Sequence, residues 1–275
     1  DETLEGYELL VLFDLDLLPA AVMARIAGFV RNGGTVIADC VPRLNEAKEP
    51  AAVLEEVFGV SGMNANRIAR YGHWVPYKTQ PPAWANRPQN TPDETVFTVD
   101  KVNAAVLDVA LDLQLVSPRP CTVTTAELLA QSADGVPVVL RGRAGKGQVF
   151  LLGFSLQDTY FQAYEDNNDA ARAQLVGLLR AITESAGVQP HVRSSNPDIE
   201  VSVRANDREA ILFVINHETV ASDVTVELRE LPFEIKSVLN FEDGRPVSFI
   251  GEEERIRLDL SVPLGEVRLL HLLPG

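Results

Sequence analysis

Cys40 is the residue of this chain with the most suggestive position for nucleophilic chemistry. It follows the apolar run TVIA, typical of a buried strand, and nucleophiles of open α/β sheets lie just beyond the carboxyl ends of such strands. The neighbouring residues argue against a reactive thiol. Pro42 lacks a backbone N–H and has a fixed φ, which a sharp turn with oxyanion donors does not tolerate, and no His-x-Glu pair follows to supply a base. We favour a small, half-buried thiol and predict no catalytic residue, with Cys40 as the only weak candidate.

Metal and cofactor sites are not predicted. The second thiol is Cys121, and the four histidines are His73, His191, His217 and His271. No spacing among them is typical of zinc or iron–sulfur ligation, and two thiols in 275 residues do not indicate a disulfide framework.

Two short motifs resemble ligand loops but have simpler explanations. GRAGKGQV (142–149) lacks the phosphate-loop pattern because Gln148 follows Gly147 and a strand comes next, so we predict a hairpin turn. The acidic string YEDNND (164–169) lacks the regular spacing of a calcium loop. We expect Asn168 or Asp169 to cap a helix instead.

An aromatic cluster leaves two interpretations open. Tyr71, Trp74, Tyr77 and Trp84 include both tryptophans of the chain and fall in a proline-rich stretch without periodicity. Flat aromatic rings pack against the C–H faces of sugars, so these residues are candidates for carbohydrate binding. Core or subunit-interface packing is the favoured alternative, because Trp and Tyr are enriched there.

The elements that would position these residues begin with a βαβ unit. YELLVLF (7–13) predicts a strand covered on both faces, residues 19–32 predict a helix that starts at Pro19, and residues 35–40 predict a second, parallel strand. A short helix is expected from 50 to 59. The stretch 61–125 is expected to be an irregular excursion from the sheet.

Regular patterns return further along the chain. Residues 127–154 contain three β-prone runs separated by Asp134-Gly135 and by Gly145-Lys146-Gly147, which predicts an antiparallel meander closing the sheet. A helix is predicted from about 169 to 186, followed by Gly187 as its stop.

The sequence pattern changes at residue 191. Seven short strand-like runs follow, with turn signals every eight to twelve residues, and no helical pattern interrupts them. We predict an open α/β sheet of flavodoxin-like, glutamine-amidotransferase-like type in residues 1–190 and an all-β, immunoglobulin-like sandwich in residues 191–275. HVRSSNPD (191–198) is expected to be a polar linker.

Composition excludes several partners. The net charge of -15 is spread over both halves, so a nucleic acid or an anionic membrane surface is not expected. No apolar run is long enough to span a bilayer, and DETLEGYELL is unlike a signal peptide, so we expect a soluble, cytoplasmic protein. The start at Asp1, directly before a strand, leads us to expect a piece of a longer chain.

The order of several motifs resembles family 42 of the glycoside hydrolases, the β-galactosidases. The motifs are YELLVLF, GGTVIAD, LEEVFGV (54–60), the stretch ELLAQSADGVPVVLRGRAGKGQVFLLG, LFVINHE (212–218) and the closing LGEVRLL. They are similar to the glutamine-amidotransferase-like domain and the small C-terminal β domain that follow the catalytic barrel of that family. The resemblance implies that a first βα unit before YELLVLF is missing, and the stretch 67–123 departs from the family pattern.

The resemblance implies assembly rather than catalysis. In that family the α/β domain mediates trimerisation and helps to wall the active site, while both catalytic glutamates lie in the barrel. We therefore expect a non-catalytic region of a β-galactosidase-like enzyme, whose partner is a second copy of the chain or its own missing barrel. The alternatives are a carbohydrate-binding module that uses Trp74 and Trp84, and a Cys40-dependent amidotransferase or peptidase.

Overall fold

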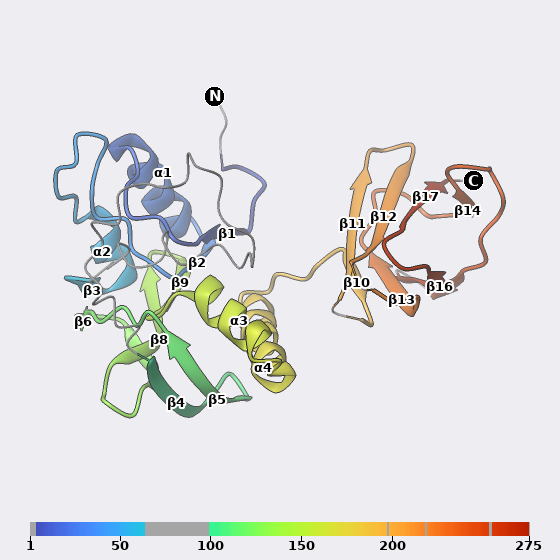
Figure 1. The fold of residues 1–275 in the computed structure, drawn as a ribbon. Helices are drawn as coiled ribbons and strands as arrows, with labels where there is room; N and C mark the ends of the chain where they lie inside the picture. The colour runs from blue at the N-terminus through green and yellow to red at the C-terminus, as the bar shows by residue number, and fades with distance from the viewer. Residues whose placement is uncertain (1–3, 64–98, 197, 218, 253–254, 275) are drawn as a thin grey trace, which may run out of the picture. The chain divides into compact units, whose positions relative to one another are not determined.

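The chain has a mixed α/β architecture with several sheets (Figure 1). The computed structural model describes residues 4–63, 99–196, 198–217, 219–252 and 255–274. They form two compact units, an α/β unit (Asp1–Val188) and a β unit (Gln189–Gly275). In the described part of the chain, no helix is both long and apolar enough to cross a bilayer.

The α/β unit is built on one five-stranded sheet of order β1-β2-β9-β8-β7. Its strands are β1 (Leu9–Leu12), β2 (Thr35–Ala38), β7 (Glu127–Gln131), β8 (Pro137–Ala144) and β9 (Gly147–Leu152). β1, β2 and β9 run parallel, whereas β7, β8 and β9 pair antiparallel. The predicted parallel βαβ unit and the antiparallel meander are therefore both confirmed.

Helix α1 (Ala20–Arg31) connects β1 to β2 and has Pro19 at its N-cap position, as its sequence predicts. The prediction for the first strand was partly wrong. β1 is at the edge of the sheet and Val11 is 47% exposed, so this strand is not covered on both faces. Helix α2 (Val53–Phe58) begins three residues later than the expected start at Pro50.

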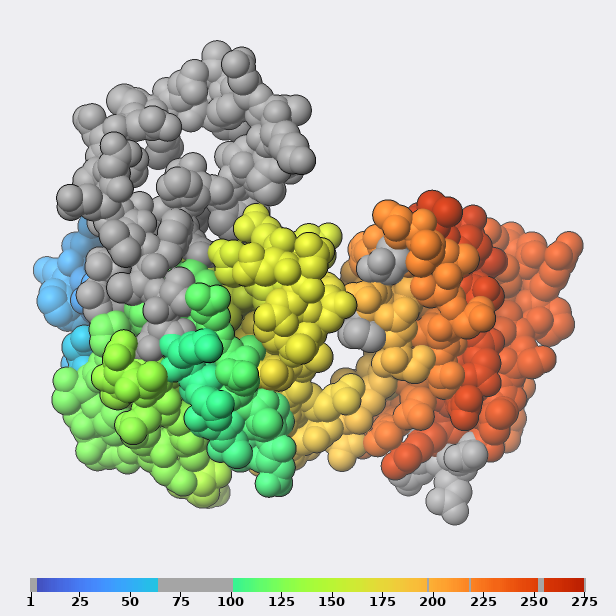
Figure 2. All heavy atoms as spheres, turned by 60° about the horizontal axis from the view of Figure 1, so that its bottom comes forward, coloured from blue at the N-terminus to red at the C-terminus, as the bar shows by residue number. Residues whose placement is uncertain are grey.

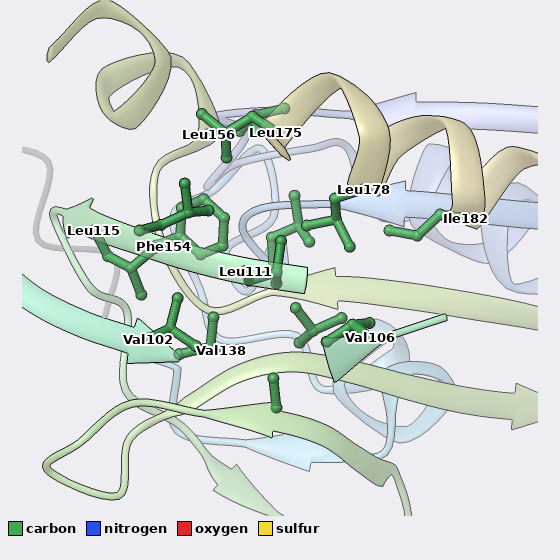
Figure 3. Close-up of a cluster of buried hydrophobic side chains, with 14 of the residues drawn as sticks. Val102, Val106, Leu111, Leu115, Val138, Phe154, Leu156, Leu175, Leu178 and Ile182 are labelled. Atoms are coloured by element: carbon green, nitrogen blue, oxygen red, sulfur yellow. The ribbon is translucent and has the colours of Figure 1, made fainter. Parts of the chain in front are cut away.

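Each face of the sheet is buried against a different layer. Along the interior strand β2, Val36 and Ala38 face one core with α1 and α2, whereas Ile37 faces the other. The second core contains α3 (Leu156–Glu165) and α4 (Asp169–Ser185), as Figure 3 shows for the apolar stripe Leu175, Leu178 and Ile182 of α4. The continuous apolar sequences of β2 and β9 follow from this burial on both sides.

The expectation of an irregular stretch from 61 to 125 was wrong for its described second half. β4 (Val99–Val106) and β5 (Val109–Val116) form an antiparallel hairpin, and α3 and α4 pack against β5 (Figure 2). Val102 and Val106 on β4 and Leu111, Leu113 and Leu115 on β5 point into the core. Two short strands, β3 (Val60–Ser61) and β6 (Thr122–Val123), also pair with each other.

The β unit consists of two four-stranded antiparallel sheets, β10-β13-β16-β15 and β11-β12-β17-β14. The strands are β10 (Val192–Ser194), β11 (Ile199–Ala205), β12 (Ala210–Asn216), β13 (Ser222–Arg229), β14 (Ser237–Asn240), β15 (Ile250–Glu252), β16 (Arg255–Val262) and β17 (Val267–Leu273). One core joins the two sheets, with Leu212 and Val214 on one and Val226 and Leu258 on the other. The residues 191–198 were expected to be a linker, but Val192–Ser194 pair with β13 and belong to the sheet.

Candidate functional site

The carboxyl ends of the parallel strands carry an ionic cluster of Asp14, Asp39 and Arg119, in which Asp39 and Arg119 are buried and Asp14 is partly exposed. Asp39 directly follows β2, Asp14 lies two residues after β1, and Arg119 comes from the segment between β5 and β6. This edge of the sheet is where α/β folds place ligands and catalytic groups. The cluster therefore lies where an α/β enzyme would hold its reacting groups.

Arg119 joins the two strand ends through its guanidinium group. Nη1 lies 2.9 Å from Asp39 Oδ1 and donates to the Asp39 carbonyl oxygen at 2.5 Å, while Nη2 lies 2.9 Å from Asp14 Oδ1. The side chain of Arg119 is 6% exposed and that of Asp39 is fully buried. A buried pair of this kind needs all its hydrogen-bonding groups satisfied, since the desolvation of both ions opposes their attraction.

Backbone groups complete the coordination of the Asp39 carboxylate. The backbone N–H of Asp14 donates to Oδ1 at 2.6 Å, and the N–H of Leu156 donates to Oδ2 at 3.2 Å. Leu156 is the first residue of α3, whose N-cap is Ser155, so the positive end of the helix dipole faces the carboxylate. Burial raises the pKa of Asp39, and Arg119 together with these two N–H groups opposes that rise.

The local backbone is shaped to bring these groups together. Asp14 has a φ of +55° and Ser117 a φ of +50°, conformations that non-glycine residues rarely adopt. The N–H of Arg119 donates to the Gly153 carbonyl oxygen at 2.6 Å, and Pro118 forms a β-bridge with Phe154. The segment before β6 is thus fastened to the end of β9, which holds Arg119 beside β2.

Cys40 is adjacent to this cluster but is not arranged as a nucleophile. Its side chain is fully buried, so the expectation of a half-buried thiol was wrong, and the thiol lies 3.9 Å from the carbonyl oxygen of Val41. Cys40 is not among the residues of positive φ, and the next helix, α2, begins only at Val53, so no strand–nucleophile–helix turn exists here. In the part of the chain that the structure describes, His191, His217 and His271 all lie in the β unit; His73 is outside that part.

The other sequence-predicted residues divide into three groups. The interpretation of GRAGKGQV as a hairpin turn between β8 and β9 is confirmed, and Asn168 caps α4 by accepting a hydrogen bond from the N–H of Ala171 at 3.0 Å. Tyr71, Trp74, Tyr77 and Trp84 lie outside the described residues, so their role in sugar or interface contacts stays a prediction. Among the described residues, no group of three or more His, Cys, Asp or Glu side chains could hold a metal ion.

Cys121 is expected to be unreactive in the folded protein. Burial raises the pKa of its thiol from 9.0 to about 11, so at pH 8 about 100-fold less thiolate is present than in the unfolded chain. Alkylation by iodoacetamide should therefore be about 100-fold slower in buffer than in urea, as followed by mass spectrometry. Equal rates at Cys121 under both conditions would contradict the partly buried position of this thiol.

Comparison with known proteins defines the fold but no family. No family model matches the chain, and no curated protein matches it. Solved structures of glycoside hydrolases do match, which gives the chain the fold of a region found in those enzymes.

Three of these structures show the extent of the likeness. The β-galactosidase from Bacillus circulans sp. alkalophilus matches 99% of this chain and 34% of its own length, with a TM-score of 0.62 and 18% identity. A catalytic mutant of a GH42 β-galactosidase from G. stearothermophilus matches 97% and 32%, with a TM-score of 0.59 and 17% identity. The α-L-fucosidase isoenzyme 2 from Paenibacillus thiaminolyticus matches 100% and 42%, with a TM-score of 0.62 and 14% identity. The chain therefore spans about a third of these β-galactosidases, and the likeness establishes the fold alone.

Proposed function

We propose that this chain is a non-catalytic region of a β-galactosidase-like glycoside hydrolase, where it serves assembly and the shaping of an active site built elsewhere. The single observation that carries the proposal is the match of nearly the whole chain to about a third of GH42 β-galactosidase chains. A region of such an enzyme that lacks chemistry of its own must act through the surfaces it presents.

The ionic cluster supports this assignment from inside the molecule. The sheet edge at which an α/β enzyme holds its reacting groups contains a carboxylate that is paired with Arg119 and accepts hydrogen bonds from the N–H groups of Asp14 and Leu156. A carboxylate held in this way links strand ends and is poorly placed to accept a proton from a substrate. We interpret the α/β unit as an amidotransferase-like, flavodoxin-like sheet in which this structural link stands where related sheets hold a catalytic group.

The proposal also covers the oligomeric state, the role of the β unit and the cellular location. By resemblance to family 42, the α/β unit would contribute to a trimer, and the β unit would be an immunoglobulin-like accessory sandwich. Cys40 and Cys121 are both free thiols, and a chain without a disulfide favours a cytoplasmic location.

The decisive experiment is an activity assay with the purified chain. We expect no turnover of p-nitrophenyl β-D-galactoside or p-nitrophenyl α-L-fucoside above the rate of buffer, because the proposal places the catalytic carboxylates outside this chain. Turnover that persists through gel filtration and co-elutes with the 30.0 kDa chain would refute the proposal.

A second assay addresses chemistry at Cys40. Glutamine hydrolysis and peptide hydrolysis should both be absent, and Cys40→Ser should leave the baseline unchanged. Activity that disappears in Cys40→Ser but persists in the matched variant Cys121→Ser would establish a thiol-dependent hydrolase instead.

A further inference from the structure

The two sheets of the β unit present outer faces of opposite character. On the β10-β13-β16-β15 sheet, the outward side chains of β13 and β16 are all polar. They are Asp223, Thr225, Glu227, Arg229, Arg255, Arg257, Asp259 and Ser261. Thr225 donates to Asp259 at 2.6 Å and Arg257 donates to the same carboxylate at 3.1 Å. This polar face is what an antiparallel sheet exposes to water.

The β11-β12-β17-β14 sheet departs from that pattern. Its inward residues form the sandwich core, but its outward residues on β12 and at the end of β14 are apolar as well. On β17 the outward Val267 and Leu269 are apolar, whereas His271 is polar and lies 2.7 Å from Glu209 Oε2. We define the apolar sheet face as Ile211, Phe213, Ile215, Leu239, Phe241, Val267 and Leu269. Phe241 is 51% exposed and Val267 is 44% exposed, and the five others are partly exposed. None of the seven belongs to a hydrophobic core of the described residues.

Strand register makes this face continuous. Phe213 pairs with Leu269 and Ile215 with Val267 across β12 and β17. In the next row His271 lies between Ile211 and Leu239, so the imidazole borders the apolar residues there. Cross-strand partners on one face lie about 5 Å apart, so their side chains form one surface. A contiguous apolar surface of this kind on a soluble domain marks an interaction site.

The strand that borders the apolar sheet face, β11, has charges of opposite sign at its two ends. On β11, Glu200 lies opposite Ile215 and Arg204 lies opposite Ile211, with Ser202 and Phe213 between them. Both charged side chains are exposed, and Glu200 is also 2.8 Å from His217 Nε2. A two-fold axis can lie between two stacked copies, perpendicular to their strands and above the row of Ser202, Phe213 and Leu269. Rotation about this axis reverses the strand direction of the second copy and keeps each strand opposite its own equivalent. It therefore places Glu200 of one copy opposite Arg204 of the other, and Phe213 opposite itself.

From this self-complementary pattern we propose that the apolar sheet face is a two-fold interface with a second copy of this chain. The same patch serves both copies, as in isologous dimers, and the two sheets stack face to face at about 10 Å. Phe213 and Leu269 form the dry centre, and the two Glu200–Arg204 pairs form the rim. The interface lies in the β unit and does not depend on the proposed function or on any assembly through the α/β unit.

Sedimentation of the full chain tests the interface. We expect Phe213→Lys to halve the mass of the assembly and to weaken its association by about 100-fold or more, because each copy brings a buried cation against its symmetry mate. Ser261→Lys adds the same charge to the polar face and should leave the mass unchanged. Circular dichroism verifies that both variants are folded.

A charge exchange tests the two-fold geometry itself. Glu200→Arg and Arg204→Glu should each weaken association, because like charges then face each other across the interface. The double variant Glu200→Arg/Arg204→Glu should regain the wild-type mass, and an equimolar mixture of the two single variants should form mixed assemblies.

Three results would overturn the proposal. The first is a wild-type chain that is monomeric at about 100 µM, a concentration at which interfaces of ordinary size associate. The second is a Phe213→Lys variant with the wild-type mass, or a Ser261→Lys variant that dissociates equally. The third is a double charge variant that associates as weakly as the single variants.

Discussion

Replacing Arg119 with methionine is expected to destabilise the α/β unit by about 4 kcal/mol, because the buried Asp39 carboxylate loses its only counter-ion at hydrogen-bonding distance among the described residues. Removal of one partner from a buried pair is far more damaging than removal of both, since an unpaired charge stays in the interior. The methionine side chain keeps most of the volume, so the effect reports charge rather than a cavity.

Urea unfolding followed by circular dichroism measures this change, with Arg43→Met as the matched control. Arg43 also lies near the strand ends, but its pair with Asp16 is 3.4 Å long and its side chain is 42% exposed. Such an exposed pair contributes at most about 1 kcal/mol. The variant Asp39→Asn in the Arg119→Met background should recover part of the loss. If Arg119→Met were no more harmful than Arg43→Met, the ionic cluster would not stabilise the fold.

Gly153→Ala is expected to destabilise the same unit by about 3 kcal/mol through steric strain. Gly153 directly follows β9, its N–H donates to the Val138 carbonyl oxygen at 2.8 Å, and its carbonyl oxygen accepts from the N–H of Arg119 at 2.6 Å. A Cβ at this position would lie 2.0 Å from the carbonyl oxygen of Pro137, a backbone atom that cannot move without opening the sheet. The substitution should therefore also loosen the attachment of Arg119.

Gly177→Ala is a control variant for which we expect a gain in stability instead of a loss. Gly177 lies inside α4, and its added Cβ would meet Val109 Cγ1 at an ordinary 3.6 Å. Alanine favours the helix by about 0.5 to 1 kcal/mol over glycine, so this variant should be more stable than the wild type. Thermal unfolding of the two variants side by side checks both signs, and equal effects at the two glycines would contradict the packing described for Gly153.

Much of the fold could be predicted from local sequence patterns. The strands β2 and β9, the helix α4 and most strands of the β unit have apolar periodicities that match their burial, together with proline and glycine at their ends. The hairpin β4–β5 was missed although β5 alternates between buried and exposed residues. Its two turn residues, Leu107 and Asp108, both have positive φ in place of the usual Asn-Gly, so the turn carried no recognisable signal.

The ionic cluster could not be predicted by the same means. Asp39 at the exit of an apolar strand is a usable sign of a buried carboxylate, whereas the prediction for this strand end concerned Cys40 beside it. Nothing local indicates that Arg119 is its partner, because 80 residues separate them and their contact depends on the arrangement of β1, β2 and β9. Helix α3 was missed as well, although Ser155 caps it by accepting from the N–H of Asp158.

The long sequence separations within the cluster have a consequence for folding. Arg119 closes loops of 80 and 105 residues when it reaches Asp39 and Asp14, and such closures carry a larger entropic penalty than the turns of the meander or of β4–β5. We therefore expect the guanidinium to engage after the strands have aligned and to contribute little to the folding nucleus. A contact that forms late mainly lowers the rate of unfolding. We therefore expect Arg119 to prolong the lifetime of the native state more than it accelerates folding.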